Sequence, residues 1–249
     1  MKHLFDLTGI TALVTGSSQG IGLALANGLS GAGARLILNG RSRDKLAEAQ
    51  AALKAEAACF DVTDANAVET AVNDLEASGR QIDILINNAG MQLRGPLEDY
   101  DPADFDRLMR TNVSSAFYVG RAVARHMIPR GKGKIINIAS VQSALARPGI
   151  APYTASKGAI SNLTKGMATD WARHGLQANA IAPGYFRTPL NEALYTDATF
   201  SAWLEARTPA GRWGDVEELC GAAIFLASAA SSFVNGQTIF VDGGITASL

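Results

Sequence analysis

The 249-residue chain carries 22 basic and 23 acidic side chains, a formal net charge of −1, and 47% hydrophobic residues. The near-neutral charge provides no attraction to nucleic acid or an anionic membrane surface, and the composition excludes a disordered chain. The two cysteines are too few for a disulfide framework, and the first six residues lack the apolar core of a signal peptide. No apolar run reaches the roughly 18 residues that a membrane helix needs. We therefore expect a single-domain, cytoplasmic globular protein with neither nucleic acid nor membrane as its partner.

Short apolar segments alternate with helical patterns along the chain. Strands are predicted at residues 10–14, 35–39, 58–60, 82–86, 134–138, 177–181 and 238–241, and helices at 21–29, 42–58, 105–124, 153–173 and 216–228. The strands show little polar alternation, which is typical of strands covered on both faces. This order predicts an α/β, Rossmann-type fold, with a doubly wound parallel sheet of about seven strands and helices on both faces.

Residues 185–215 form the one long insertion between the later elements, and they contain two prolines and two tryptophans. We interpret this segment as a helical lid or substrate loop, because long ordered connections are often functional. An ordered crossover without function is the alternative interpretation.

A glycine-rich turn joins the first strand to the first helix and contains Gly16, Gly20 and Gly22. Glycines there let backbone amides approach a pyrophosphate at the positive end of the helix dipole, although a tight structural turn has the same composition. The turn also matches the G-x-S-x-G elbow of hydrolases, which would make Ser18 a nucleophile. That alternative needs a later acid and histidine, and neither His126 nor His174 closes a recognisable triad.

Four polar residues follow at positions suited to proton transfer. Tyr153 and Lys157 lie four residues apart in a predicted helix, so both project from one face. A free tyrosine is only about 0.1% ionised at neutral pH, and a nearby cation favours its phenolate. Ser140 follows a strand at the sheet edge where ligands bind, and its hydroxyl can donate to a substrate oxygen. Asn112 falls in a predicted helix, where asparagine is disfavoured. Taken singly, these residues also fit a surface pair, a helix cap and a solvent-facing asparagine.

The ordered set of motifs resembles the short-chain dehydrogenase/reductase family over essentially the whole chain. The motifs are the glycine-rich turn, Asn87-Asn88-Ala89-Gly90, Ser140, Tyr153 with Lys157, and Pro183-Gly184. The resemblance implies a dehydrogenase or ketoreductase acting on CH–OH groups. It assigns catalysis to Asn112, Ser140, Tyr153 and Lys157, with Asn112 holding a water that links Lys157 to solvent.

The resemblance also implies one domain over residues 1–249. Its cofactor-binding part covers about 1–135, its catalytic and substrate part about 136–249, and its lid about 185–215. Members of the family are usually homotetramers, which predicts interfaces on helices 153–173 and 216–228.

The residues after the second strand predict the cofactor. Arg41 and Arg43 precede the first acid, Asp44, and an arginine here accommodates the 2′-phosphate of NADP(H), whereas NAD(H) sites carry an acid. A surface charge at the helix start is the alternative for Arg41. The resemblance places the cofactor contacts at Gly16, Ser18, Gln19, Gly20, Ile21, Gly22, Arg41, Asp61, Val62, Asn88, Ala89, Gly90, Tyr153, Lys157, Pro183, Gly184 and Thr188. Gln19 departs from the family, in which an arginine is frequent.

Segments 124–131, 140–153, 165–171 and 207–214 resemble family members that interconvert D-gluconate and 5-keto-D-gluconate. Such a substrate is a polyhydroxylated anion, for which a binding arginine is expected. The predicted substrate contacts are Arg94, Ser140, Gln142, Arg147 and Tyr153, with Ser143 close by and Arg187 and Arg207 as weaker options.

Two further interpretations stay open. Ala144 stands where the family has an acid, so another carbonyl substrate, such as a 3-oxoacyl thioester or a different sugar acid, is an alternative. A non-catalytic nucleotide-binding module is a second alternative, because a fold does not establish a function. No metal is predicted, since the three histidines have no ligand spacing.

Overall fold

The computed structural model describes residues 4–248, so the first half of the N-terminal segment considered above lies outside the described residues. Seven strands form one sheet in the order β3-β2-β1-β4-β5-β6-β7, and every neighbouring pair is parallel. The strands are β1 (Thr11–Val14), β2 (Arg35–Gly40), β3 (Glu56–Cys59), β4 (Ile84–Asn87), β5 (Gly133–Ile138), β6 (Leu176–Pro183) and β7 (Thr238–Val241). The order reverses between β1 and β4, which confirms the doubly wound fold and places the ligand-binding crevice beside that reversal.

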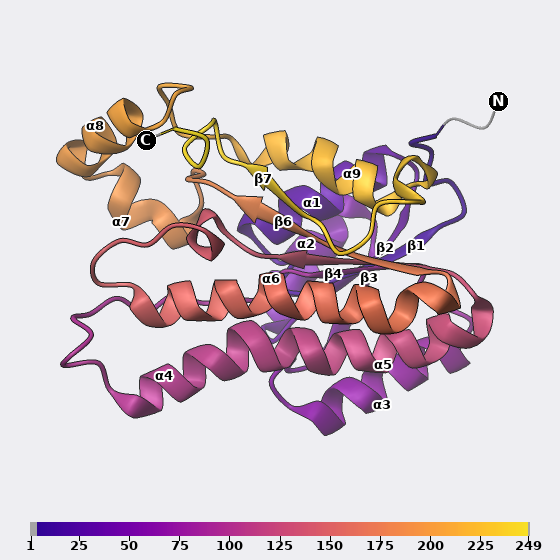
Figure 1. Ribbon diagram of the computed structural model, residues 1–249. Helices are drawn as coiled ribbons and strands as arrows, with labels where there is room; N and C mark the ends of the chain where they lie inside the picture. The colour runs from indigo at the N-terminus through magenta and orange to yellow at the C-terminus, as the bar shows by residue number, and fades with distance from the viewer. Residues whose placement is uncertain (1–3, 249) are drawn as a thin grey trace.

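Helices cover both faces of the sheet (Figure 1). On one face lie α1 (Gly20–Gly31), α2 (Arg43–Leu53) and α9 (Cys220–Ala227), and on the other α3 (Ala65–Ala77), α4 (Pro102–Met109), α5 (Ser115–Arg130) and α6 (Ala151–Trp171). Side chains of β1 alternate between these layers: Ala12 and Val14 pack in the core beneath α1, and Leu13 packs in the core beneath α5. Both layers are apolar, which is why the strand sequence itself does not alternate.

The predicted helix 42–58 is wrong at its C-terminal end. α2 ends at Leu53 because Lys54 adopts a left-handed conformation with φ of 49°, and β3 begins at Glu56. The alanines of this segment favour helix, but parallel pairing with β2 determines their conformation. The third strand accordingly starts two residues before its predicted position, and helix α3 lies in a region where no helix was predicted.

Two later helices are interrupted. The predicted helix 105–124 consists of α4, a π-helical turn at Arg110–Ser114 and α5. The predicted helix 216–228 consists of the 3₁₀ turn Val216–Leu219 followed by α9.

Segment 185–215 contains α7 (Glu192–Tyr195) and α8 (Ala198–Arg207), which project from one end of the sheet (Figure 1). None of the helices within residues 4–248 combines the length and the apolarity needed to cross a bilayer.

Candidate active site

A cavity of about 630 Å³ opens at the carboxyl edge of the sheet. Every residue predicted to contact the cofactor lines it, from the turn after β1 to Thr188. Of the predicted substrate residues, Ser140, Gln142, Arg147 and Tyr153 line it. The structure thus brings together residues that lie far apart in the sequence, as expected where parallel strands end at a topological reversal.

The glycine-rich turn packs directly against the loop that follows β4. A Cβ on Gly16, whose φ is +62°, would lie 2.9 Å from the Ala89 Cα, and a Cβ on Gly22 would lie 2.5 Å from the Gly16 carbonyl oxygen. Asn88 Nδ2 donates to the carbonyls of Thr15 and Gly16, each at 3.0 Å. The two loops therefore form one rigid backbone surface that has no room for larger residues.

The structure disfavours the hydrolase alternative for Ser18. His126 lies on α5, where its Nε2 is 2.9 Å from Asn73 Oδ1, and His174 lies in the 3₁₀ turn Ala172–His174, where its Nε2 accepts from Arg173. Neither histidine lines the cavity that contains Ser18. The described part of the chain therefore supplies no histidine to activate this serine.

The cation predicted for a 2′-phosphate lies at the rim of the cavity. Arg41 Nη1 is 3.7 Å from Asp61 Oδ2. Burial raises the pKa of Asp61, but hydrogen bonds from Thr63 and the charge of Arg41 outweigh burial and hold this pKa below its usual value. Arg43 does not line the cavity, whereas Lys45, one turn into α2, does. Sequence reasoning missed Lys45, which lies in the first turn of α2, three residues after the N-cap Ser42.

Tyr153 and Lys157 lie in the N-terminal half of α6, where Lys157 is buried and Tyr153 is partly buried. Lys157 Nζ lies 5.6 Å from the centroid of the Tyr153 ring and donates to the Ile138 carbonyl at 2.7 Å. Burial lowers the pKa of Lys157 to about 8. Burial also raises the pKa of Tyr153 to about 12, opposed by a hydrogen bond to Ser140 and by the charge of Arg94. At neutral pH the phenol is therefore protonated and can act as a proton donor.

Asn112 lies in the π-helical turn and is buried, but it does not line the cavity. Its Oδ1 accepts from the Met91 amide at 2.8 Å, while its Nδ2 donates to the Met91 carbonyl at 2.9 Å and to Ser156 Oγ at 3.1 Å. Ser156 in turn donates to the Tyr153 carbonyl at 2.7 Å. Both amide hydrogens of Asn112 bind protein, so this side chain holds the loop after β4 against α6.

The remaining substrate candidates do not line the cavity. Arg94 lies beside the cavity but not on its wall, and Ser143 donates to the Lys157 carbonyl at 3.0 Å outside it. Arg207 donates to Ser248 at the C-terminal end, and Arg187 is exposed. Ser143, Arg187 and Arg207 do not line the cavity, so nothing in the structure supports them as substrate contacts and they stay predictions.

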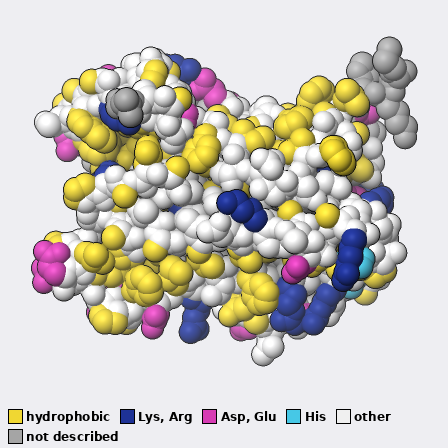
Figure 2. Space-filling view, in the orientation of Figure 1, with side chains coloured by type: hydrophobic (Ala, Val, Ile, Leu, Met, Phe, Trp, Pro, Cys, Tyr) yellow, Lys and Arg dark blue, Asp and Glu magenta, His cyan; other side chains and the backbone are white. Residues whose placement is uncertain are grey.

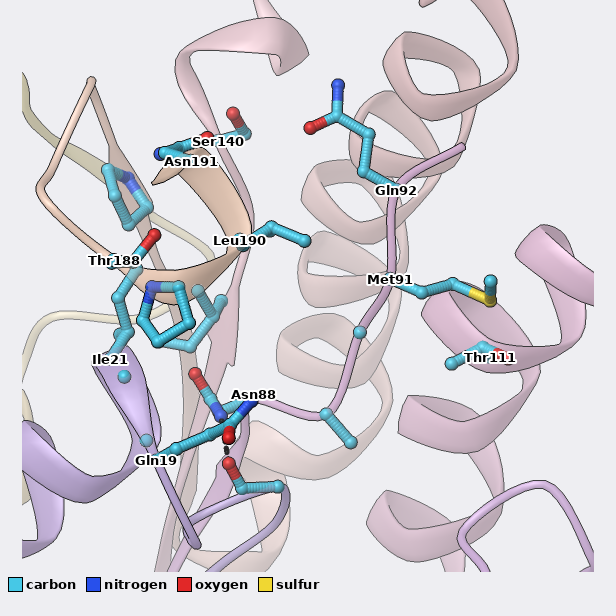
Figure 3. A pocket seen from close by; sticks show the side chains of 18 of the residues that line it. Gln19, Ile21, Asn88, Met91, Gln92, Thr111, Ser140, Thr188, Leu190 and Asn191 are labelled. Atoms are coloured by element: carbon cyan, nitrogen blue, oxygen red, sulfur yellow. Dashed lines mark hydrogen bonds between the residues drawn. The ribbon is translucent and has the colours of Figure 1, made fainter. Parts of the chain in front are cut away.

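Segment 185–215 supplies cavity residues that sequence reasoning did not identify. Figure 3 shows Leu190 directed across the cavity toward the chain that carries Met91 and Gln92, with Thr188 and Asn191 beside it. Leu190 is 49% exposed, so its side chain is free to cover a ligand. Thr188 was predicted as a cofactor contact, whereas no local sequence pattern distinguishes Leu190 and Asn191 from an ordinary loop. Within the described residues, no group of three or more His, Cys, Asp or Glu side chains is arranged to hold a metal ion.

A cavity lined by a glycine-rich turn and by Ser140, Tyr153 and Lys157 is typical of one class of oxidoreductases. The family model described as enoyl-(acyl carrier protein) reductase matches residues 16–246. The chain belongs to the short-chain dehydrogenase/reductase family, as the motifs predicted.

Within the family, the chain is similar to enzymes of gluconate metabolism. Gluconate 5-dehydrogenase of Gluconobacter oxydans (strain 621H) is 63% identical over 256 residues, covering 100% of both chains. The 5-keto-D-gluconate 5-reductase of Escherichia coli (strain K12) is 48% identical over 250 residues, covering 98% of each. A crystal structure of a gluconate 5-dehydrogenase from Burkholderia cenocepacia J2315, in complex with NADP and tartrate, aligns with a TM-score of 0.97 at 58% identity, covering 99% of this chain and 98% of that one.

Proposed function

We propose that the protein is an NADP(H)-dependent oxidoreductase that interconverts D-gluconate and 5-keto-D-gluconate by hydride transfer. The observation that carries this proposal is the position of Ser140, Tyr153 and Lys157 on the wall of a glycine-built cavity, in a chain with the full-length similarities given above. The proposed catalytic residues are these three together with Asn112.

The chain's own residues supply the proton chemistry. When bound, the nicotinamide supplies or accepts the hydride. In the reductive direction the Tyr153 hydroxyl gives its proton to the oxygen of the former carbonyl, and Ser140 donates a hydrogen bond to the same oxygen. The positive charge of Lys157 favours the resulting phenolate, which takes the proton back when the alcohol is oxidised. Asn112 contributes by holding the loop after β4 against α6; the family resemblance adds a proton relay from Lys157 through water.

The residues present fit NADP(H). Gly16, Gly20 and Gly22 would hold the pyrophosphate against the start of α1, and Arg41 would pair with the 2′-phosphate. Ser18, Gln19, Ile21, Asp61, Val62, Asn88, Ala89, Gly90, Pro183, Gly184 and Thr188 complete the proposed contacts, with Tyr153 and Lys157 at the nicotinamide end. We also propose that residues 1–135 form the cofactor-binding part and residues 136–249 the catalytic part, with a lid over residues 185–215.

The proposed substrate contacts are Arg94, Ser140, Gln142, Arg147 and Tyr153. Arginine is suited to a carboxylate, and Ser140 and Gln142 are suited to hydroxyl groups. The relative from Burkholderia cenocepacia was crystallised with tartrate, itself a hydroxy acid, which supports an acidic substrate.

We further propose a cytoplasmic homotetramer. Figure 2 shows hydrophobic side chains gathered along the lower part of the molecule, where Figure 1 places α4 and α5. Phe105 on α4 and Phe117 on α5 are 39% and 44% exposed, and Phe240 on the edge strand β7 is 37% exposed. Apolar helix faces and an uncovered strand edge are typical of surfaces between subunits, and the interfaces predicted on residues 153–173 and 216–228 remain part of this proposal. The two free cysteines, Cys59 and Cys220, suit a reducing compartment.

An assay of NADPH consumption tests the function. Purified protein is incubated with 5-keto-D-gluconate, other keto sugar acids and a 3-oxoacyl thioester, each with NADPH and with NADH. We expect the highest kcat/KM for 5-keto-D-gluconate with NADPH. Preference for the thioester would overturn the substrate, and cofactor binding without turnover of any compound would favour the non-catalytic alternative.

A further inference from the structure

A chain of buried polar side chains joins the sheet to α6 behind the cavity wall. Asn87 on β4 and Asn137 on β5 are register partners, and Asn87 Nδ2 donates to Asn137 Oδ1 at 2.9 Å. Asn137 Nδ2 donates to Thr164 Oγ1 on α6 at 2.9 Å, and Thr164 Oγ1 donates to the Ile160 carbonyl at 2.8 Å. Asn137 and Thr164 are each 0% exposed. All these bonds donate in one direction, from β4 through β5 into α6, so each strengthens the next.

The packing around this chain is apolar. Met167 belongs to one core cluster, and Ile160 and Ala180 belong to another. Apolar packing is non-directional, so it does not by itself fix where a helix lies along its own axis. A buried hydrogen bond is directional and costly to leave unmade, and a single buried asparagine can fix the register of a coiled coil for this reason. The bond between Asn137 and Thr164 is therefore suited to fix the position of α6 along β5.

Both partners of this bond lead directly to the reaction centre. On β5, the residue after the asparagine is Ile138, whose carbonyl accepts from Lys157 Nζ at 2.7 Å, and Ser140 follows two residues later. On α6, Lys157 lies seven residues before Thr164, about two turns away and on the same face. Tyr153 lies one turn further along this face. A displacement of α6 along β5 would thus move Lys157 away from Ile138 and Tyr153 away from Ser140 together.

We propose that Asn137 and Thr164 are positioning residues for catalysis, because their hydrogen bond holds α6 where its tyrosine and lysine meet Ser140. They act through α6, since neither side chain lines the cavity. The inference rests on the proposed function for the hydride-transfer reaction, but it holds for any carbonyl substrate.

Steady-state kinetics test the hydroxyl of Thr164. Thr164→Val removes this hydroxyl and keeps the β-branched shape. We expect kcat to fall about 10- to 100-fold, because a displacement of about 1 Å at a reaction centre has effects of this size. KM for the substrate and for NADPH should stay within about twofold of the wild type, because the cavity wall is unchanged. Thr164→Ser retains the hydroxyl and should restore kcat to within about threefold.

Two control variants separate positioning from a general loss of stability. Thr169→Val, on the same helix, removes an equivalent bond to the Lys165 carbonyl at 2.8 Å, but this threonine is exposed. Asn179→Ala removes a buried asparagine on β6 whose Nδ2 donates to the Val234 carbonyl at 2.8 Å. Both controls should retain kcat, although Asn179→Ala should unfold at a lower temperature. Near-wild-type kcat in Thr164→Val, or an equal loss of kcat in Asn179→Ala, would overturn the proposal.

A stability measurement tests the position of α6 without any turnover. Burial lowers the pKa of Lys157 to about 8, so the free energy of unfolding rises between pH 8 and pH 10.5. Tyr153, whose ring faces Lys157 Nζ at 5.6 Å, has a pKa of about 12 and stays protonated in the fold over this range. Lys134 has a similarly lowered pKa, but it donates to Ser231, so its contribution should be the same in every variant.

Urea unfolding across this pH range gives the deciding result. If α6 is displaced in Thr164→Val, Lys157 leaves the Ile138 carbonyl and gains water. The part of the rise that Lys157 contributes should then shrink at least about twofold, whereas Thr164→Ser and Thr169→Val should keep it. A full rise in Thr164→Val would overturn the proposal. If the wild type reduces no carbonyl compound, the proposed function fails, but this measurement still shows whether the Asn137–Thr164 bond positions α6.

Discussion

At the nucleotide end of the cavity, polar side chains are paired with the protein, whereas at the substrate end two of them are not. Asn88 donates to the carbonyls of Thr15 and Gly16, and Asn39 Nδ2 donates to the carbonyls of Ala58 and Phe60 at 3.0 and 3.1 Å. Arg147 Nε and Gln142 Oε1, in contrast, are buried without partners.

This difference separates a surface whose polar groups are satisfied by folding from one in which two polar atoms are not. The paired end owes its shape to folding, so changes there should reduce stability and cofactor affinity together. At the unpaired end, each orphaned group bears a desolvation cost of about 1–3 kcal/mol. Changes at that end should alter substrate KM and leave the fold intact. Four variants test the reaction centre and the paired end.

The largest effect is expected at the reaction centre, between the two ends. Tyr153→Phe removes the proton donor without removing the ring, so kcat should fall by about 10²- to 10⁴-fold, as for the loss of a general acid. NADPH affinity, measured by fluorescence, should stay near the wild-type value. Tyr118→Phe on α5, outside the cavity, is the control and should leave kcat unchanged. Near-wild-type turnover by Tyr153→Phe would exclude Tyr153 as the proton donor.

The second effect is a pH-dependent stability that arises from Lys157. Its pKa is about 8 in the fold against 10.5 ordinarily, so between these values the unfolded chain binds the extra proton and the free energy of unfolding rises with pH. This difference in pKa corresponds to about 3 kcal/mol. Between pH 8 and pH 10.5, the free energy of unfolding of the wild type should therefore rise by about 3 kcal/mol relative to that of Lys157→Met. Urea unfolding across this range measures it. Exposed Lys165→Met, on the same helix, should run parallel to wild type. If Lys157→Met also runs parallel, the charged state of Lys157 is not linked to folding.

At the paired end, Gly22 and Gly31 lie on the same helix and should respond in opposite directions. A Cβ at Gly22 would meet Asn88 and the Gly16 carbonyl, whereas a Cβ at Gly31 would meet nothing within 4 Å. Gly22→Ala should lower the free energy of unfolding by about 1–3 kcal/mol, and NADPH affinity with it. Gly31→Ala should be neutral or stabilise by up to about 1 kcal/mol. Thermal unfolding with and without NADPH distinguishes the two. If Gly22→Ala loses NADPH affinity without losing stability, cofactor affinity and stability do not depend on the same packing.

The sequence predicted the paired end better than the unpaired one, and the reason is physical. The parallel strands, the glycine turn and the cavity position of Tyr153 and Lys157 follow from local patterns and from the rule that ligands bind where parallel strands end. The left-handed Lys54 and the π-helical turn around Asn112 have no such local signature. The cavity position of Leu190 and the stacking of Phe200 on Arg147 arise only when distant segments pack together.

The smallest effect concerns the cation at the rim. The Arg41 side chain is 75% exposed, so its contribution to binding a 2′-phosphate should be modest and sensitive to salt. Arg41→Ala should raise KM for NADPH about 10-fold at low ionic strength, corresponding to about 1.4 kcal/mol, and leave KM for NADH unchanged. Arg43→Ala is the matched control, because Arg43 does not line the cavity. If KM rises equally for NADPH and NADH, Arg41 acts by holding Asp61 in place rather than by binding phosphate.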